Sequence, residues 1–214
     1  MFEAIKLYGY WRSSAAYRVR IALNLKRRAW VDAPVHLVKG EQKTDAYRSK
    51  APVGLVPALE LPDGTVLTQS LAILDWLDHE EPEPPLFPQD PIERAQVMAA
   101  GMVIAVDTHP LQNSGVVAHV RETFGVGQDE GVAWMAHWMH RGFGAFQQMC
   151  RPDTPFAFGD QPGFADICLV PQLYNAHLWK VDLKPYSRLL EIERNCLRLP
   201  AFREARPEAQ PDAE

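Results

Sequence analysis

The 214-residue sequence has few cysteines, no excess of positive charge and no long apolar run. Its three cysteines, Cys150, Cys168 and Cys196, lie far apart and form neither a CxxC pair nor a zinc-ligand spacing, so we expect reduced thiols in a cytoplasmic protein. A formal net charge of −5 argues against nucleic acid or an anionic membrane as a partner. No apolar stretch approaches the length that spans a bilayer, and we expect neither a membrane segment nor a signal peptide.

What is present is typical of a folded globular chain, with 47% hydrophobic and 23% charged residues. Proline is concentrated in one place, because five of the 18 prolines lie between Glu80 and Pro91. Proline runs resist both helix and strand, so we predict a linker there. The predicted organisation is an N-terminal domain over residues 1–81, a linker over 82–91 and an all-helical C-terminal domain over 92–214.

The first 80 residues alternate strand and helix signals. Strands are predicted at Ile5–Leu7, at Trp30–Leu37 with Pro34 marking a sheet edge, at Val53–Leu61 and at Val66–Thr68. A helix follows the first strand, a polar loop with one helical turn is predicted over Lys39–Lys50, and Ser70 is predicted to cap a second helix. This order of strand, helix, strand, hairpin and helix is the thioredoxin-like layout.

Beyond the linker the apolar spacing is helical. The Pro-rich and polar tail, Ala205–Glu214, is predicted to be loose. The predicted helices are Ile92–Val106, Val116–Phe124, Asp129–Cys150, Phe164–Leu178 and Leu189–Leu197.

One stretch near the start carries most of the chemistry. Ser13 and Ser14 offer side-chain oxygens at the start of the first helix, and Arg12 and Arg18 flank them. A helix N-terminus presents unpaired N–H groups and a partial positive charge, which suits an anion or an anionic sulfur. On spacing alone, an ordinary strand followed by a well-capped helix explains the same residues.

The stretch from Arg12 to Leu23 reads RSSAAYRVRIAL, and it is similar to the active-site motif of zeta-class glutathione transferases, the maleylacetoacetate and maleylpyruvate isomerases. The family motif runs Arg-Ser-Ser-Cys-x-x-Arg-Val-Arg-Ile-Ala-Leu. The departure is Ala15, where the family usually carries Cys and some isomerases carry Thr. The resemblance extends from Ile5 to about Pro211. It implies the glutathione transferase fold, an α/β thioredoxin-like N-terminal domain followed by an all-α C-terminal domain.

Three later segments carry the same resemblance. The run from His109 to Asn113 reads HPLQN and matches a segment that faces bound glutathione in the family. Gly163 and Asp166 match a helix-capping motif, with Gly in place of the usual Ser or Thr. Val181–Tyr186 matches a further family segment. The capping motif indicates fold and not catalysis.

The peptide bond before Pro57 is a case where pattern and resemblance differ. Most X–Pro bonds are trans, so the residues alone favour a trans proline at a strand start. The family places a cis-proline here, with the preceding residue, Val56, pairing with the backbone of glutathione. The resemblance therefore implies a cis bond.

Glutathione is the cofactor that the resemblance implies. Ser13 or Ser14 would stabilise its thiolate, and Arg12 is the remaining cation for the substrate or an enolate; these three are the predicted catalytic residues. The predicted glutathione-binding residues are Ser13, Ser14, Ala15, Arg18, Gln42, Val56, Gln69, Ser70, His109, Gln112 and Asn113.

The implied activity is cis–trans isomerisation of a maleylacetoacetate- or maleylpyruvate-like small molecule, by thiolate addition, bond rotation and elimination. Two carboxylate-binding arginines of the family are replaced here by Leu178 and Ser114. Two alternatives stay open: a transferase that conjugates or dehalogenates an apolar electrophile, and a non-catalytic glutathione- or ligand-binding protein. Because members of this family are typically dimers, the resemblance implies a homodimer. His137 and His140 lie three positions apart but have no third ligand, so we predict no metal site.

Overall fold

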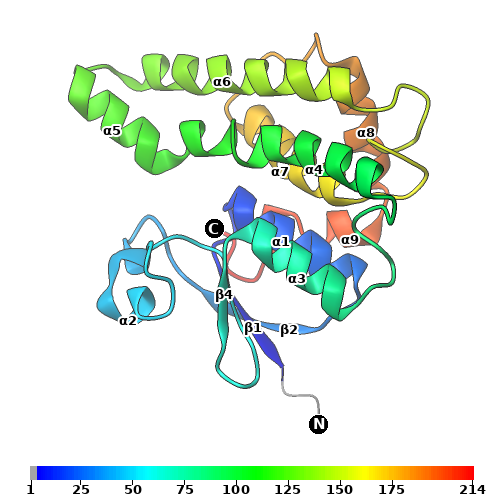
Figure 1. Ribbon diagram of the computed structural model, residues 1–214. Helices are drawn as coiled ribbons and strands as arrows, with labels where there is room; N and C mark the ends of the chain where they lie inside the picture. The colour runs from blue at the N-terminus through cyan, green and yellow to red at the C-terminus, as the bar shows by residue number, and fades with distance from the viewer. Residues whose placement is uncertain (1–3) are drawn as a thin grey trace. The chain divides into compact units, whose positions relative to one another are not determined.

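The computed structural model describes residues 4–214. The described chain forms two compact units (Figure 1): the part up to Leu86 together with Leu197–Glu214, and Phe87–Cys196. The first unit contains β1 (Ile5–Gly9), α1 (Ser14–Leu25), β2 (Trp30–Pro34), the 3₁₀ turn η1 (Glu41–Lys43), α2 (Asp45–Arg48), β3 (Ala58–Glu60), β4 (Val66–Thr68), α3 (Ser70–Glu80), α9 (Pro200–Arg203) and the 3₁₀ turn η3 (Pro207–Ala209).

The first unit is built on one four-stranded sheet in the order β2-β1-β3-β4. β1 and β2 are parallel and are joined through α1, whereas β3 runs antiparallel to both β1 and β4. Pro34 lies on the edge strand β2, as predicted, where its missing N–H breaks no ladder. α1 and α3 pack against one another (Figure 1). The predicted thioredoxin-like layout is confirmed.

Two strands are shorter than predicted. β2 ends at Pro34 instead of Leu37, and β3 begins at Ala58 instead of Val53. The backbone explains the second difference, because Gly54 has a left-handed φ of +69° and Pro57 has no N–H to donate to a ladder. The Val56–Pro57 bond is cis, as the resemblance implies.

The core of this unit lies between the sheet and the two long helices. Tyr17 and Ile21 of α1, four positions apart, are almost wholly buried. Every residue from Ala16 to Leu23 is also buried, so this helix is covered on more than one face. Ile5 and Leu7 of β1 are buried on alternate positions around exposed Lys6, the period of a strand with one covered face. The predicted first helix and the predicted strand at Ile5–Leu7 are therefore confirmed.

The second unit is helical. Its longest helix, α6, follows the shorter α5, and the packed pairs include α4 with α6 and α4 with α7. α7 has the predicted bounds because Asp166 accepts hydrogen bonds from the Gly163 N–H at 3.0 Å and the Ala157 N–H at 2.8 Å. Burial raises the pKa of Asp166 to about 6 against the opposing effect of these bonds. The elements are α4 (Pro91–Ala105), the 3₁₀ turn η2 (His109–Gln112), α5 (Ser114–Phe124), α6 (Gln128–Met149), α7 (Phe164–Leu178) and α8 (Ser187–Leu197).

The end of the chain differs from the prediction. The tail is not loose, because α9, η3 and the residues after them pack on the first unit. Tyr17 donates to the Phe202 carbonyl at 3.3 Å, and Arg20 donates to the Ala205 carbonyl at 3.0 Å. The helical unit is therefore shorter than the predicted domain of residues 92–214. The predicted first domain lacks this returning segment, and its first three residues lie outside the described chain.

Two features that would bear on function are absent from residues 4–214. None of their helices is both long and apolar enough to cross a membrane. No three His, Cys, Asp or Glu side chains in the same residues are grouped to hold a metal ion. The three cysteines are buried, and none of them forms a disulfide within the described residues.

Candidate functional site

The register of the sheet brings three predicted site segments to one edge. Tyr8 pairs with Ala58, and Ala58 pairs with Thr68. The residues after β1, before β3 and after β4 must therefore leave the sheet at the same end. These are the segments that contain Ser13 and Ser14, Val56, and Gln69 and Ser70.

The N-terminus of α1 presents hydrogen-bond donors. Ser13 is the N-cap, and its Oγ accepts from the Ala16 N–H at 3.2 Å. Its hydroxyl hydrogen stays available for donation. Ser14 is 8% exposed, and no described residue hydrogen-bonds to its hydroxyl. This helix start can place hydroxyl and backbone donors around one anion.

The N-terminus of α3 is a second donor group. The prediction that Ser70 caps this helix is wrong, because the N-cap is Gln69 and Ser70 is the first helical residue. Gln69 makes no side-chain capping bond, so no side chain of the described residues caps the first N–H groups of the helix. Gln69 has φ +68° and ψ 113°, a strained backbone for a residue with a Cβ. Such strain is concentrated at ligand sites. Buried Arg18 donates to the Ser70 hydroxyl at 3.1 Å and so connects α1 to this helix start.

Between the two helix starts in the sequence, the backbone of Val56 and the side-chain oxygen of Gln42 have no hydrogen-bond partner among residues 4–214. No residue of the described chain bonds to the backbone N–H or C=O of Val56. Gln42 donates to the Leu37 carbonyl at 3.3 Å, while its Oε1 is buried and has no partner among residues 4–214. An extended peptide could pair with the backbone of Val56 and donate a hydrogen bond to Gln42 Oε1.

A hydrophobic cluster supports this edge of the sheet. Tyr10, Tyr47 and Val56 are buried in it, and Trp11 packs against them. The Tyr47 hydroxyl also donates to the Leu55 carbonyl at 2.8 Å, and burial raises the pKa of Tyr47 to about 12. The loop before Val56 is therefore held by packing and by a hydrogen bond.

Two predicted site residues, Ala15 and Arg12, lie in or next to the first turn of α1. Ala15 is half-buried in the first turn of α1, where its methyl group supplies no polar atom. Arg12 is exposed, and its guanidinium lies 5.5 Å from the centre of the Trp11 ring. Arg12 is thus a long, exposed cationic side chain next to the helix start and not part of a fixed ion pair.

The predicted residues of the second unit form a connected group around η2. Gln112 is 3% exposed, donates toward His109 Nδ1 at 3.1 Å and accepts from Asn175. Asn113 caps α5 by accepting from the Gly115 N–H at 2.9 Å. A direct ligand contact would require Gln112 to exchange these partners. Binding of glutathione by His109, Gln112 and Asn113 stays a prediction.

The sequence interpretation missed the segment after Phe202. Asp212 accepts from the Trp11 N–H at 3.0 Å, one residue before Arg12. Glu214 lies 3.0 Å from His36 Nε2, and the His36 ring lies 5.4 Å from that of Tyr10. Nothing in the local pattern of residues 205–214 indicates these contacts, because both partners lie near the other end of the sequence.

Comparison with known proteins agrees with this arrangement. Family models for the N-terminal and C-terminal domains of glutathione S-transferase match residues 7–85 and 132–208. A maleylacetoacetate isomerase of Rhizobium meliloti is 44% identical over 204 residues, 94% of this chain and 95% of that protein.

Solved structures agree over almost the whole chain. A holo structure of maleylpyruvate isomerase, described as a bacterial zeta-class glutathione S-transferase, has TM-score 0.95 and 40% identity over 98% of this chain and all of that one. A maleylacetoacetate isomerase from Anaeromyxobacter dehalogenans with glutathione bound in its active site has TM-score 0.89 and 40% identity, over 99% and 98% of the two chains.

Proposed function

The chain belongs to the glutathione S-transferase family, and from that premise we propose that it is a glutathione-dependent cis–trans isomerase of the maleylacetoacetate or maleylpyruvate type. The observation that carries the proposal is the sheet register, which brings Val56 and the starts of α1 and α3 to one edge. The substrate would be a small molecule with a cis double bond conjugated to a carbonyl group.

The residues of this edge fit glutathione. The uncapped start of α3 and the Ser70 hydroxyl would hold a carboxylate, and Val56 would pair with a peptide group. The buried Oε1 of Gln42 would accept from an N–H or ammonium group. The described chain leaves the Val56 peptide group and Gln42 Oε1 open for a ligand, and the Ser70 hydroxyl, which accepts from Arg18, keeps its hydrogen for donation.

Glutathione, when bound, supplies the thiolate that adds to the double bond, permits rotation and then leaves. The protein's part is to stabilise negative charge, first on sulfur and then on the substrate. Ser13 and Ser14 would donate to the sulfur together with the start of α1, which lowers a thiol pKa. Exposed Arg12 would attract the anionic substrate and stabilise charge on its oxygen.

The decisive test is turnover. Purified protein would be mixed with maleylpyruvate or maleylacetoacetate, with and without glutathione, and the loss of cis-substrate absorbance would be followed. We expect turnover that requires glutathione. Glutathione binding without turnover of either compound would mean that the thiol site is correct and the substrate is wrong.

One observation favours a second activity. Leu178 stands where the family tends to carry a carboxylate-binding arginine, and it is an apolar side chain that is 43% exposed. An apolar electrophile, such as an aryl or alkyl halide, would suit it better than a dianion. Glutathione conjugation of an aryl halide at a rate above that of the isomerisation would favour this alternative.

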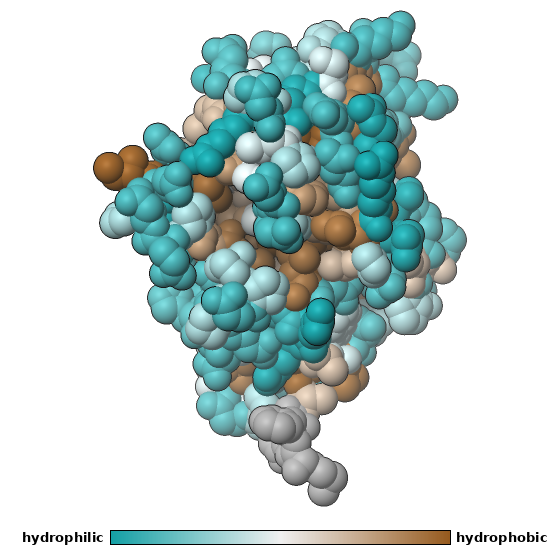
Figure 2. Space-filling model, turned by 90° about the vertical axis from the view of Figure 1, so that its right-hand side faces the viewer, coloured by the Kyte–Doolittle hydropathy of each residue, from teal (hydrophilic) through white to brown (hydrophobic). Residues whose placement is uncertain are grey.

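We also propose a cytoplasmic homodimer. Exposed apolar residues of the first unit include Val38, Val53 and Leu55, and Figure 2 shows hydrophobic side chains reaching the surface on the face that it presents. A self-association surface would cover such residues. Light scattering is expected to give twice the chain mass, and a monomer across the working concentration range would contradict the dimer.

A further inference from the structure

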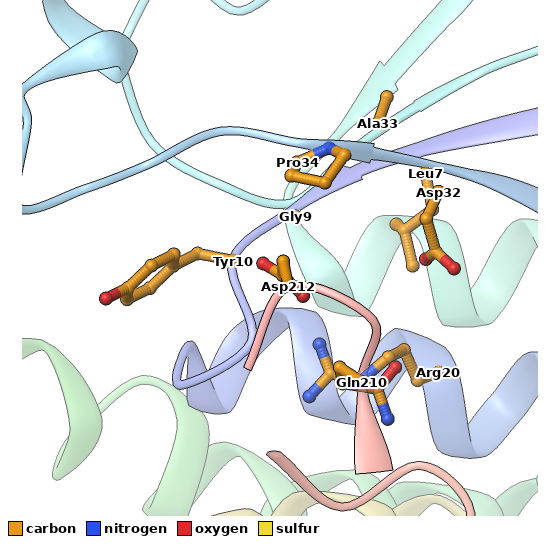
Figure 3. A pocket seen from close by; sticks show the side chains of 9 residues that line it. All are labelled: Leu7, Gly9, Tyr10, Arg20, Asp32, Ala33, Pro34, Gln210 and Asp212. Atoms are coloured by element: carbon orange, nitrogen blue, oxygen red, sulfur yellow. The ribbon is translucent and has the colours of Figure 1, made fainter. Parts of the chain in front are cut away.

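The segment 205–214 lies against the loop that leads into α1. Figure 3 shows Asp212 and Gln210 of this segment beside Arg20 of α1, with Gly9 and Tyr10 close by. The space between them has a volume of only about 10 Å³, room for one water molecule and not for an organic ligand. None of the predicted glutathione-binding residues lines it. The segment therefore acts here as a support and not as the wall of a binding pocket.

The contact is specific at the level of single peptide groups. The Asp212 carboxylate accepts from the Trp11 N–H at 3.0 Å, and the Tyr10 carbonyl of the same peptide accepts from the Ser13 N–H at 2.9 Å. A peptide group is planar and rigid, so turning its N–H away also turns its C=O away. One peptide group thus connects Asp212 to Ser13.

The next peptide group is held from the same side. Arg20, 3% exposed, donates to the Trp11 carbonyl at 3.0 Å and to the Ala205 carbonyl at 3.0 Å. Gln210 closes the turn before Asp212 by donating to the Glu204 carbonyl at 2.9 Å and to the Arg206 carbonyl at 2.7 Å. Both peptide groups that flank Trp11 are therefore fixed by groups outside the loop.

From this geometry we propose that Asp212 is a positioning residue for the thiolate site, acting through the Tyr10–Trp11 peptide on Ser13. The inference rests on the proposed function and deepens it. Asp212 does not touch the sulfur; it holds the backbone whose next turn presents the serine hydroxyls. Misplacing such donors by a fraction of a hydrogen-bond length weakens thiolate stabilisation steeply.

The sign of the effect distinguishes positioning from direct electrostatics. A carboxylate close to a thiolate opposes it, so removal of the Asp212 charge alone would lower the thiol pKa. Loss of positioning raises the thiol pKa instead. Asp212→Ala removes both charge and acceptor, whereas Asp212→Asn removes the charge and keeps an oxygen that can accept from the Trp11 N–H.

The experiment measures the pKa of bound glutathione by thiolate ultraviolet absorbance in the full-length protein, together with kcat, KM and Tm. For Asp212→Ala we expect the thiol pKa to rise by about 1 and kcat to fall about ten-fold, with little change in the KM of the cis substrate. Asp212→Asn should restore most of both. Glu208→Ala is the matched control, because Glu208 lies in the same segment and pairs with Arg206 at 3.5 Å.

The outcomes separate this inference from the proposed function. An unchanged or lowered thiol pKa in Asp212→Ala, with glutathione still bound, overturns the positioning role even if the wild type is an isomerase. Equal defects in the Asn and Ala variants overturn it too, because only the acceptor should matter. The thiol titration needs no turnover, so a wild type that binds glutathione without isomerising still decides the role of Asp212. Wild-type protein that binds no glutathione overturns both.

Discussion

The guanidinium of Arg18 donates to the Ser70 hydroxyl at 3.1 Å, and both residues are buried, at 2% and 6% exposure. Arg18 belongs to α1 and Ser70 is the first residue of α3, 52 positions later. The bond therefore joins the two helices whose N-terminal groups form the candidate site. A charge-assisted hydrogen bond in such a place stabilises the unit and also sets the separation of the two helix starts.

A double-mutant cycle should measure this coupling. Arg18→Met, Ser70→Ala and the double variant would be unfolded with urea in the absence of glutathione. We expect an interaction free energy of about 1–2 kcal/mol, because the bond is buried and charge-assisted. Arg48→Met, on the short helix α2, serves as a control for loss of one arginine. Additive free energies would mean that packing alone, without this hydrogen bond, holds the two helix starts together.

Substitution of the two serines at the start of α1 should change the stability of the protein by different amounts. Ser13 is the N-cap, so Ser13→Ala is expected to lower the free energy of unfolding by about 1 kcal/mol. The Ser14 hydroxyl has no partner among residues 4–214, so Ser14→Ala should change stability by less than about 0.5 kcal/mol. Urea unfolding of both variants tests this difference.

The variants Ser13→Ala and Ser14→Ala also test whether the hydroxyl groups stabilise the thiolate of bound glutathione. Both changes should raise the pKa of bound glutathione, because each removes a hydroxyl donor next to the helix start. A stable Ser14→Ala variant with an unchanged thiol pKa would leave Ser13 as the sole hydroxyl donor. An unchanged thiol pKa in both variants would contradict hydroxyl activation altogether.

Glu60 should make the stability of the folded protein depend on pH in the acidic range. Its carboxylate lies 2.6 Å from Lys50 Nζ and accepts from the Tyr8 hydroxyl at 2.7 Å, and these bonds lower its pKa to about 2. Because the folded pKa lies below the unfolded value, the contribution is fully present above about pH 4.5 and is lost as the pH falls toward 2. The Tm difference between wild type and Glu60→Gln should therefore shrink across this window. A constant difference would contradict the assignment to Glu60.

Local signals predicted much of the fold. The start of α3 lies within one residue of its predicted place, although Gln69 and not Ser70 is its N-cap. α7 has its predicted bounds, and Asp166 bonds to the Gly163 N–H within its first turn. β4 also lies where its residue types indicate. Each of these signals acts over a few residues, so each is visible in the linear pattern. The limits of β3 were less visible, since they depend on the backbone at Gly54 and Pro57.

The site required more than local signals. Residue types alone allowed Ser13 to be an ordinary helix cap, which it is, as well as a donor to an anion. Its meeting with Val56 and Ser70 depends on which strands pair and in what register. Family resemblance supplied that information before the structure did. The support from Asp212 was hidden from both, because its partner Trp11 lies 201 positions away.

Close packing in the helical unit should make its stability sensitive to a substitution at Gly101 of α4. A Cβ there would lie 2.7 Å from Cδ1 of the Phe164 ring and 3.3 Å from the Cys168 sulfur. The ring cannot easily move, since it is 1% exposed and stacks on Phe87 at 4.6 Å between centres. Gly101→Ala should therefore lower the free energy of unfolding by about 1–3 kcal/mol, despite the better helix propensity of alanine.

Gly144 of α6 provides the matched control. It is also a helical glycine, but a Cβ there would meet no described atom within 4 Å. Gly144→Ala should consequently stabilise the protein by about 0.5–1 kcal/mol through helix propensity and the lower entropy of the unfolded chain. Urea unfolding of the two variants should thus give changes of opposite sign. Stabilisation by both would mean that α4 can move away from α7, because only such a shift would make room for the new methyl group.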